Sequence, residues 1–580
     1  MFRQIKFFLN IPSTYVGDNG KNLLNAGQQK RNCVELVLNP QRKGSSDQGR
    51  QHSKIFLETS LKQTLLWWKK IQNILLGNFR LTKKSSSKKI LVSASHYIGN
   101  LFHARIFLPE LCALFRAEAA CFSFEAVPDK DKLRWLKNLS CPCLLGEREL
   151  RPFQQQAETI AQLLLQKFVN QETLINYCID KIPLGILIHD HYLRRKCVAQ
   201  VDLKDPEFLR DLILGIKIYL TTKNYFENNS TVLIWADHPV YLESGVILQV
   251  AAKYGIPCLH LGGGSSPMAF FIYPPKTRRK EHALKMAYQI PYEEFPSLFK
   301  KLSLEQKRRA LSWAKKSLHR HLGGGKKEIV AGGHTPFRLV ARKKLIRSSR
   351  IEALVLPRDF SDAPNVYGKM LFPDNLSWLT FVLKESQKTN FPWALKPHPN
   401  RWSGDGEKMN RLNQAVLEKI RLQFPHVEFL EPHTSYYELI QRGLRTVFTP
   451  CGSVGHELPA LGVAVVNGGR NPHISYNFNY HPASRKKLAS LIRKADKLRP
   501  RNTKKIPEFY YMYYKFLEDT SSVKNLWPKR LDQAFQVTQD LPSSLGLKRL
   551  AGEFPVLKTQ SSKIQNHFKN EKMQLTKKAF

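Results

Sequence analysis

Short apolar runs alternate with helical stretches along most of this chain, and this alternation restricts its fold more than any other feature. Strand-like runs are expected at 89–95, 182–190, 230–239 and 256–261, separated by helical stretches at 101–117, 206–228 and 241–255. Strands that alternate with helices favour a parallel sheet covered by helices. We therefore expect an α/β fold in this half of the chain.

A second alternating series begins at residue 351. We expect its strands at 351–357, 392–399, 426–432, 444–450 and 463–469, with helices at 376–388, 407–423, 435–443 and 453–461. One helix between successive strands is the doubly wound pattern. Glycines at 323–325 and 332–333 precede this series, as a linker would require. The sequence thus predicts two α/β lobes joined by a linker, with a cleft between them.

Composition changes mark the expected domain boundaries. We expect a basic arm of low order at 1–88, a first lobe at 89–325, a basic linker at 326–350, a second lobe at 351–495, a helical return segment at 496–545 and a tail at 546–580. The arm contains a basic amphipathic stretch at 61–79 with two tryptophans. Such a helix can lie on an anionic membrane, or it can dock on the body of the protein.

The charge indicates an anionic partner. Lys and Arg number 91 against 47 Asp and Glu, a formal net charge of +44. Nucleic acid, anionic lipid and phosphorylated substrates all fit that excess. The basic residues are spread along the chain, and no RRM, KH, zinc-finger or helix-turn-helix signature supports a nucleic-acid-binding protein.

The nine cysteines are scattered and form no paired C-x-x-C motif, which argues against a zinc ribbon. Reduced, mostly buried thiols are expected, and with them a cytoplasmic location. The N-terminal apolar stretch is too short for a signal peptide, and no apolar run reaches 18 residues. The sequence therefore predicts a cytoplasmic protein that can attach peripherally to the inner face of the cell membrane.

The loop at 449–457 is the most informative candidate for a binding site. Gly452 permits backbone angles that other residues avoid, Ser453 suits a helix N-cap, and Glu457 lies four residues later on the same helical face. Amide groups freed at such a turn can hold an anion. The alternative is an ordinary capped turn between a strand and a short helix that contains Pro459.

The loop "KPHPN" at 396–400 should lie at the same edge of the second sheet. Its prolines stiffen the loop, and neither Lys396 nor His398 has an apolar slot to fill. His398 can therefore be held against a phosphate, with Lys396 adding positive charge. The alternative is a solvated strand end.

These two loops, with "PHTSYYELI" and "TPCGSVGHELPALGVAVVNGGRNPH", resemble the C-terminal half of bacterial capsule and surface-polysaccharide biosynthesis proteins. That group includes enzymes similar to Kdo transferases, which use a CMP-sugar on a GT-B scaffold of two Rossmann-like lobes. Segments at 182–194, 237–257 and 358–379 resemble the same family.

The resemblance assigns roles to individual residues. It implies that His398 contacts the donor phosphate, that Gly452, Ser453 and Gly455 hold the same anion, and that Glu457 binds the nucleotide ribose. The sequence departs from the family pattern at Cys451, His456, His473 and His189.

A carboxylate on the acceptor side must deprotonate the incoming hydroxyl, because a sugar hydroxyl is a weak nucleophile. Asp190 and Asp237 both follow strand-like runs and are the candidates, although Asp237 can instead cap a helix. Arg194 is placed to hold an anionic acceptor. A retaining route through a covalent carboxylate intermediate stays open.

The leading hypothesis is a glycosyltransferase of surface-polysaccharide biosynthesis that moves a sugar from a nucleotide donor, CMP-linked, to a glycan or lipid-linked acceptor. No resident cofactor and no metal are expected. The glycine runs at 260–264 and 321–327 match neither an NAD fingerprint nor a P-loop. The alternatives are a polyol-phosphate transferase with a CDP-linked donor and a non-catalytic partner in polysaccharide assembly or export.

Overall fold

The computed structural model describes residues 88–94, 141–256 without 237 and 238, 292–324, 349–399 and 406–516, with shorter stretches at 108, 112, 115–124, 258–261, 270–273 and 337. The two sheets that the described residues form lie within one compact unit. The expected basic arm, its amphipathic stretch at 61–79, most of the linker and the tail from 546 lie outside the described residues.

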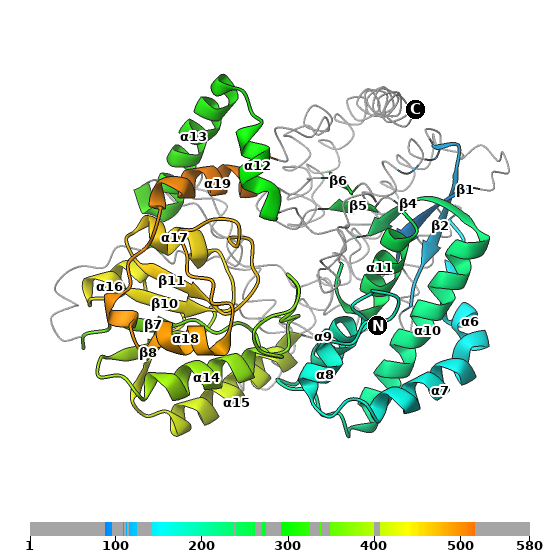
Figure 1. Ribbon diagram of the computed structural model, residues 1–580, viewed down its shortest axis with the longest axis horizontal. Coiled ribbons are helices and arrows are strands. Elements are labelled where there is room, and N and C mark those ends of the chain that lie inside the picture. The colour runs from blue at the N-terminus through cyan, green and yellow to red at the C-terminus, as the bar shows by residue number, and fades with distance from the viewer. Residues whose placement is uncertain are drawn as a thin grey trace, which may run out of the picture. The chain divides into compact units, whose positions relative to one another are not determined.

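The first lobe is built on a six-stranded sheet (Figure 1). Its strands are β1 (Lys88–Ser93), β2 (Glu118–Phe122), β3 (Cys143–Leu145), β4 (Ser230–Ala236), β5 (Cys258–Leu261) and β6 (Phe270–Tyr273). They lie in the order β3-β2-β1-β4-β5-β6, and every neighbouring pair is parallel except β5 with β6. This is the strand order of a doubly wound Rossmann fold.

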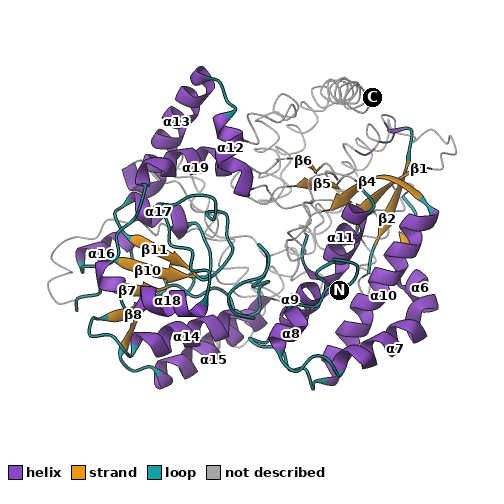
Figure 2. Ribbon diagram, viewed as in Figure 1, coloured by secondary structure: helices purple, strands orange, loops and turns teal. Residues whose placement is uncertain are grey.

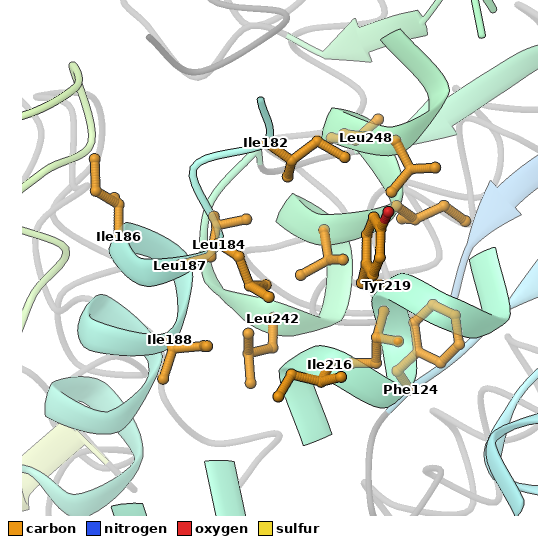
Figure 3. Close-up of a cluster of buried hydrophobic side chains, with 14 of the residues drawn as sticks. Phe124, Ile182, Leu184, Ile186, Leu187, Ile188, Ile216, Tyr219, Leu242 and Leu248 are labelled. Atoms are coloured by element: carbon orange, nitrogen blue, oxygen red, sulfur yellow. The ribbon is translucent and has the colours of Figure 1, made fainter. Parts of the chain in front are cut away.

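Helices pack beside this sheet (Figure 2). They are α6 (Glu147–Leu150), η1 (Arg151–Phe153), α7 (Gln154–Leu165), α8 (Gln171–Ile175), α9 (Leu184–Lys196), α10 (Pro206–Asn228), the π-helical segment η2 (Tyr241–Gly245) and α11 (Val246–Lys253). Side chains of α9, α10 and α11 share one buried core with the strands (Figure 3). In it Leu187, Ile216 and Leu248 are fully buried.

The expected strand at 182–190 is wrong, because this segment begins helix α9. Every side chain of α9 from Leu184 to Leu193 is buried. A helix that is buried on all sides shows no polar face, so its sequence lacks the periodicity that separates a helix from a buried strand. The helix expected at 206–228 is confirmed as α10.

The second lobe is built on a five-stranded parallel sheet. Its strands are β7 (Ala353–Val355), β8 (Trp393–Leu395), β9 (Val427–Phe429), β10 (Thr446–Thr449) and β11 (Ala464–Asn467), in the order β11-β10-β7-β8-β9. All five expected strands are confirmed within their ranges. The order is that of the first five strands of the first lobe.

Alternate residues of these short strands enter different cores. Ala353 and Val355 pack with Trp378 of α14 (Asn375–Ser386) on one face, whereas Leu354 packs with α13 (Leu304–His319) and α19 (Ile506–Tyr514) on the other. Since both faces are covered, the strands read as continuous apolar runs.

The remaining helical segments are η4 (Tyr292–Glu294), α12 (Phe295–Lys300), η5 (Arg320–Gly324), α15 (Glu407–Gln423), α16 (Tyr436–Gln441), α17 (Val454–Ala460), α18 (Arg485–Ile492), η8 (Ala495–Lys497) and η9 (Thr503–Lys505).

Helices α12 and α13 contribute Phe295, Phe299 and Ala314 to a core of the second lobe. The sequence boundary at residue 325 had assigned them to the first lobe. Tertiary packing places α12 and α13 with the second lobe, because α19 comes from the end of that lobe and packs against both helices.

The architecture confirms the expected fold class of two Rossmann-like α/β lobes. Across the part of the chain that the structure describes, no helix combines the length and apolar character needed to cross a bilayer. The cysteines among these residues are unpaired thiols, and five of the eight are buried.

Gly185 is required by the packing of α9 against α8. A Cβ at this position would lie 1.8 Å from the carbonyl oxygen of Leu174. We expect Gly185→Ala to lower the free energy of unfolding by about 3 kcal/mol or more, measured by urea denaturation. Gly146→Ala is the control, since its Cβ would meet nothing closer than 3.4 Å. Equal stability of the two variants would contradict the close packing of α9 against α8 at Gly185.

Candidate functional site

The second sheet has its topological switch point between β7 and β10, which are neighbours although β8 and β9 lie between them in the sequence. In doubly wound sheets ligands bind outside the carboxyl ends of the strands at this point. The loops that follow β7, β8 and β10 are therefore the candidate site, and they contain the donor-site residues expected from the sequence.

Lys396 follows β8 directly and is only 3% exposed. Its Nζ atom lies 4.8 Å from the ring centroid of Tyr436, within the range of a cation–π contact. Burial lowers the pKa of Lys396 to about 8, and the nearby charge of Glu457 opposes this shift. The lysine is thus part of a buried site rather than a solvated strand end.

Glu457 on α17 is also 3% exposed. Its Oε1 atom lies 2.8 Å from Nε2 of His321, and Ser453 donates a second hydrogen bond to the carboxylate. Burial by itself would raise the pKa of Glu457, but these hydrogen bonds and the neighbouring histidines hold it below its usual value. A ribose hydroxyl would have to replace one of these partners.

Residues from two expected loops therefore meet at the carboxyl edge. Lys396 interacts with Glu457, and Ser453 hydrogen-bonds to the same carboxylate. Ser453 stands at the N-cap position of α17 but makes no side-chain cap hydrogen bond, contrary to its expected local role. The sequence did not identify His321, because it lies 136 residues before Glu457.

Gly452 and Gly455 are each required in this loop for a different physical reason. Gly452 has φ of +139°, a backbone conformation that side chains disfavour. At Gly455 a Cβ would lie 2.4 Å from Cε1 of His473, so the absence of a side chain lets α17 pack against that histidine. The anion-binding roles of both glycines stay predictions.

His398 is exposed and lies two residues after Lys396 in the loop beyond β8. Its expected contact with a donor phosphate stays a prediction.

Beneath the loop, buried side chains form a directional hydrogen-bond chain. Asn471 Oδ1 can only accept, so His473 donates from Nδ1 at 3.1 Å and accepts at Nε2 from His456 Nδ1, also at 3.1 Å. His456 Nε2 then accepts from the hydroxyl of Tyr514 at 3.1 Å. Burial lowers the pKa of His456 to about 4, so both rings are neutral near pH 7. This series of hydrogen bonds holds α17 against α19.

Asp190, the first candidate for the catalytic base, is fully buried in the middle of α9. Its Oδ2 accepts from the backbone N–H of Asn365 at 3.1 Å, and its Oδ1 accepts from Asn365 Nδ2 and His189 Nδ1, both at 2.9 Å. The carboxylate lies where solvent does not reach it. In this arrangement Asp190 links α9 to the loop after β7.

The other two acceptor-side candidates have different outcomes. Asp237 lies outside the described residues. Arg194 stands in the last turn of α9, with Nη1 3.9 Å from Oδ1 of Asp362, and it also contacts Met409. Its role in acceptor binding stays a prediction.

Arg358 was not identified from the sequence as a site residue. Its Nη1 atom lies 3.1 Å from Sγ of Cys451, and its Nη2 atom lies 3.6 Å from Oδ2 of Asp362. An arginine in a polar loop carries no signal of its own. Only the adjacency of β7 and β10 brings Arg358 to the loop of Gly452 and Ser453.

A cavity of about 760 Å³ is lined by residues of α14, α15 and α8, including Lys384, Lys419 and Gln171. None of the expected site residues lines it. We regard the switch point as the candidate site, because the buried Lys396 and Glu457 interact there beside two loops expected from the sequence. Among the described residues, no group of three or more His, Cys, Asp or Glu side chains is arranged to hold a metal ion.

No family model and no curated protein matches this sequence. Solved structures to which the chain is similar include the beta Kdo 2,4 transferase KpsC of Thermosulfurimonas dismutans, at 15% identity and a TM-score of 0.28, with 52% of this chain and 85% of that chain covered. They also include UDP-GlcNAc 2-epimerases of Neisseria meningitidis, at 11% identity and a TM-score of 0.21, covering 76% and 100%, and of Methanocaldococcus jannaschii, at 12% and 0.25, covering 73% and 97%. Likenesses this distant carry no argument about function.

The burial of Asp190 leads to a stability prediction. We expect Asp190→Asn to lower the free energy of unfolding by about 2–4 kcal/mol, because the amide would face the donor groups of Asn365. The exposed Asp202→Asn is the control and should stay within about 0.5 kcal/mol of the parent. Chemical denaturation measures both. An unchanged stability of Asp190→Asn would favour a free, catalytic carboxylate instead.

The buried Lys396 leads to a pH prediction. Its pKa is about 8 in the folded protein, against an ordinary value of 10.5, so the unfolded chain binds more protons between these values. The buried charge of Lys396 therefore destabilises the folded state fully below pH 8, and this destabilisation disappears as the pH rises to 10.5. Lys396→Met should therefore be more stable than the parent by about 2–3 kcal/mol at pH 7, and this advantage should shrink by pH 10.

Thermal and urea unfolding at both pH values test this expectation. Lys384→Met, at an exposed position on α14, should show no such pH-dependent difference. A Lys396→Met variant less stable than the parent at pH 7 would contradict it.

Proposed function

We propose that the protein is a glycosyltransferase that transfers a sugar from a nucleotide donor, CMP-linked, to a glycan or lipid-linked acceptor in surface-polysaccharide biosynthesis. The observation that carries the proposal is the grouping of Lys396, Ser453 and Glu457 at the carboxyl edge of the second sheet. These residues come from two separate loops that resemble the donor site of the Kdo-transferase-like family of surface-polysaccharide biosynthesis proteins. The strand order of both lobes supports the proposal, since this topology places ligand sites at such edges.

The arrangement can perform the binding part of this reaction. Lys396 supplies positive charge in a poorly hydrated setting, where its attraction for a phosphate is stronger than in water. His398 stands in the same loop, where it can donate a hydrogen bond to the phosphate. Glu457 can accept from ribose hydroxyls if it exchanges the hydrogen bond of His321 or Ser453.

The positive charge of the chain supports a site of action at the membrane. Each Lys or Arg near an anionic surface contributes about 1 kcal/mol to attachment, so a few of them suffice for reversible docking. Lipid-linked acceptors at the inner face of the membrane would then be within reach.

A second candidate is a non-catalytic partner in polysaccharide assembly that binds nucleotide-sugars without turning them over. The burial of Asp190 favours it, because this carboxylate lies out of reach of an acceptor hydroxyl. Product analysis with a panel of CMP-sugars separates the two candidates. Binding without sugar transfer or hydrolysis would favour the partner.

We expect CMP to raise the melting temperature more than CDP, UDP or ADP do. A ligand at about 100 times its Kd stabilises the folded state by about 2.7 kcal/mol. His398→Ala should remove most of this shift, because it deletes a phosphate contact. His426→Ala is the matched control, since this exposed histidine precedes β9 at the amino edge of the sheet. Absence of a shift with every nucleotide, together with salt-sensitive RNA binding, would overturn the proposal.

A further inference from the structure

The switch point of the second sheet contains a cation, Arg358, that is not among the expected site residues. Arg358 stands three residues after β7 and Cys451 two residues after β10, and their side chains meet across the two loops. The contact is a hydrogen bond from Nη1 to Sγ at 3.1 Å. Because a thiol sulfur is a weak acceptor, this bond satisfies the guanidinium poorly.

Among the described residues, Arg358 meets few hydrogen-bond acceptors. A guanidinium has five N–H donors. Among the described residues its carboxylate neighbour is Asp362, and the 3.6 Å between Nη2 and Oδ2 exceeds a normal hydrogen bond. The side chain is nevertheless only 25% exposed. A largely buried cation with donors to spare is suited to an anionic ligand.

Asp362 does not pair with Arg358 exclusively. Its Oδ1 accepts from the hydroxyl of Tyr241 at 2.9 Å and lies 3.9 Å from Nη1 of Arg194. One carboxylate thus stands between two guanidinium groups. Arg194 and Tyr241 come from the first lobe, whereas Arg358 and Asp362 come from the second.

The backbone at Tyr241 adds an independent observation. Tyr241 has φ of +63° and begins the π-helical segment η2 directly after the loop that follows β4. Left-handed backbone strains a bulky residue, and such strained residues cluster at functional sites. The tyrosine is 7% exposed and directs its hydroxyl at Asp362, so the strained residue belongs to the same cluster.

We propose that Arg358 is the anion receptor of the switch point and binds a phosphate group of the nucleotide donor through paired N–H donors. The identity of the ligand as a nucleotide rests on the proposed function. The phosphate is the chemistry that a planar guanidinium at the carboxyl edge of a Rossmann-type sheet recognises. On binding, the phosphate oxygens take the place of the Cys451 thiol, while Asp362 keeps the guanidinium oriented.

Titration calorimetry with CMP, cytidine and inorganic pyrophosphate at constant ionic strength tests the proposal. The parent protein should bind CMP more tightly than cytidine, because only CMP carries the phosphate. Arg358→Gln should weaken CMP binding by about 10- to 100-fold and leave cytidine binding unchanged. Arg358→Lys keeps the charge but loses the paired donors, so it should lie between the parent and Arg358→Gln.

Arg350→Gln is the matched control. Arg350 precedes the same strand at its amino end, is 63% exposed and pairs with Glu352 at 2.9 Å. The Arg350→Gln variant should bind CMP as tightly as the parent protein does. If Arg358→Gln does not fold, Arg358→Lys carries the test, and CMP binding within twofold of the parent would overturn the proposal.

The outcomes separate this inference from the proposed function. If the parent binds CMP and the Arg358 variants bind it equally well, the inference fails and the proposed function stands. If the parent binds pyrophosphate through Arg358 but prefers no nucleotide, the anion site stands and the proposed function fails. If the parent binds none of the three ligands, both are overturned.

Discussion

A buried carboxylate has to be satisfied by hydrogen bonds, and in this protein that requirement connects the two lobes. Asp190 lies inside the first lobe, and Asn365 of the second lobe supplies two of its three hydrogen bonds. The same loop carries Arg358 and Asp362, so the position of the switch-point cation depends on this contact. Removal of either partner would leave polar groups buried without compensation.

The second sheet then determines which side chains can act together. Its five short strands are covered on both faces, so its carboxyl edge is where polar side chains can gather. Lys396, Glu457 and His321 meet there although they come from three distant parts of the sequence. Burial of Lys396 at this edge lowers its pKa, because the charged ammonium group is poorly hydrated there. The same poor hydration strengthens the attraction of Lys396 for anions.

Much of the second lobe could be predicted from its sequence. Each strand is a short, largely apolar run with Pro or Gly on at least one side, and α15 matches its expected range of 407–423 because one face of that stretch is polar. The prediction failed at 182–190, where α9 is apolar on all sides and carries no periodic signal. The boundary at 325 differed because α12 and α13 take their place through contact with α19.

By itself the sequence determined the local properties of this protein: the alternation of strands and helices, the stiff loop around His398 and the glycine turn at Gly452. These follow from periodicity and backbone stereochemistry, which act between near neighbours. Tertiary structure alone decided that Asp190 is a buried link, that His321 hydrogen-bonds to Glu457, and that Arg358 meets Cys451. The reason is that these contacts join residues that are far apart in the chain. The adjacency of β7 and β10 brings Arg358 to Cys451, whereas packing of helices and loops brings together the other two pairs.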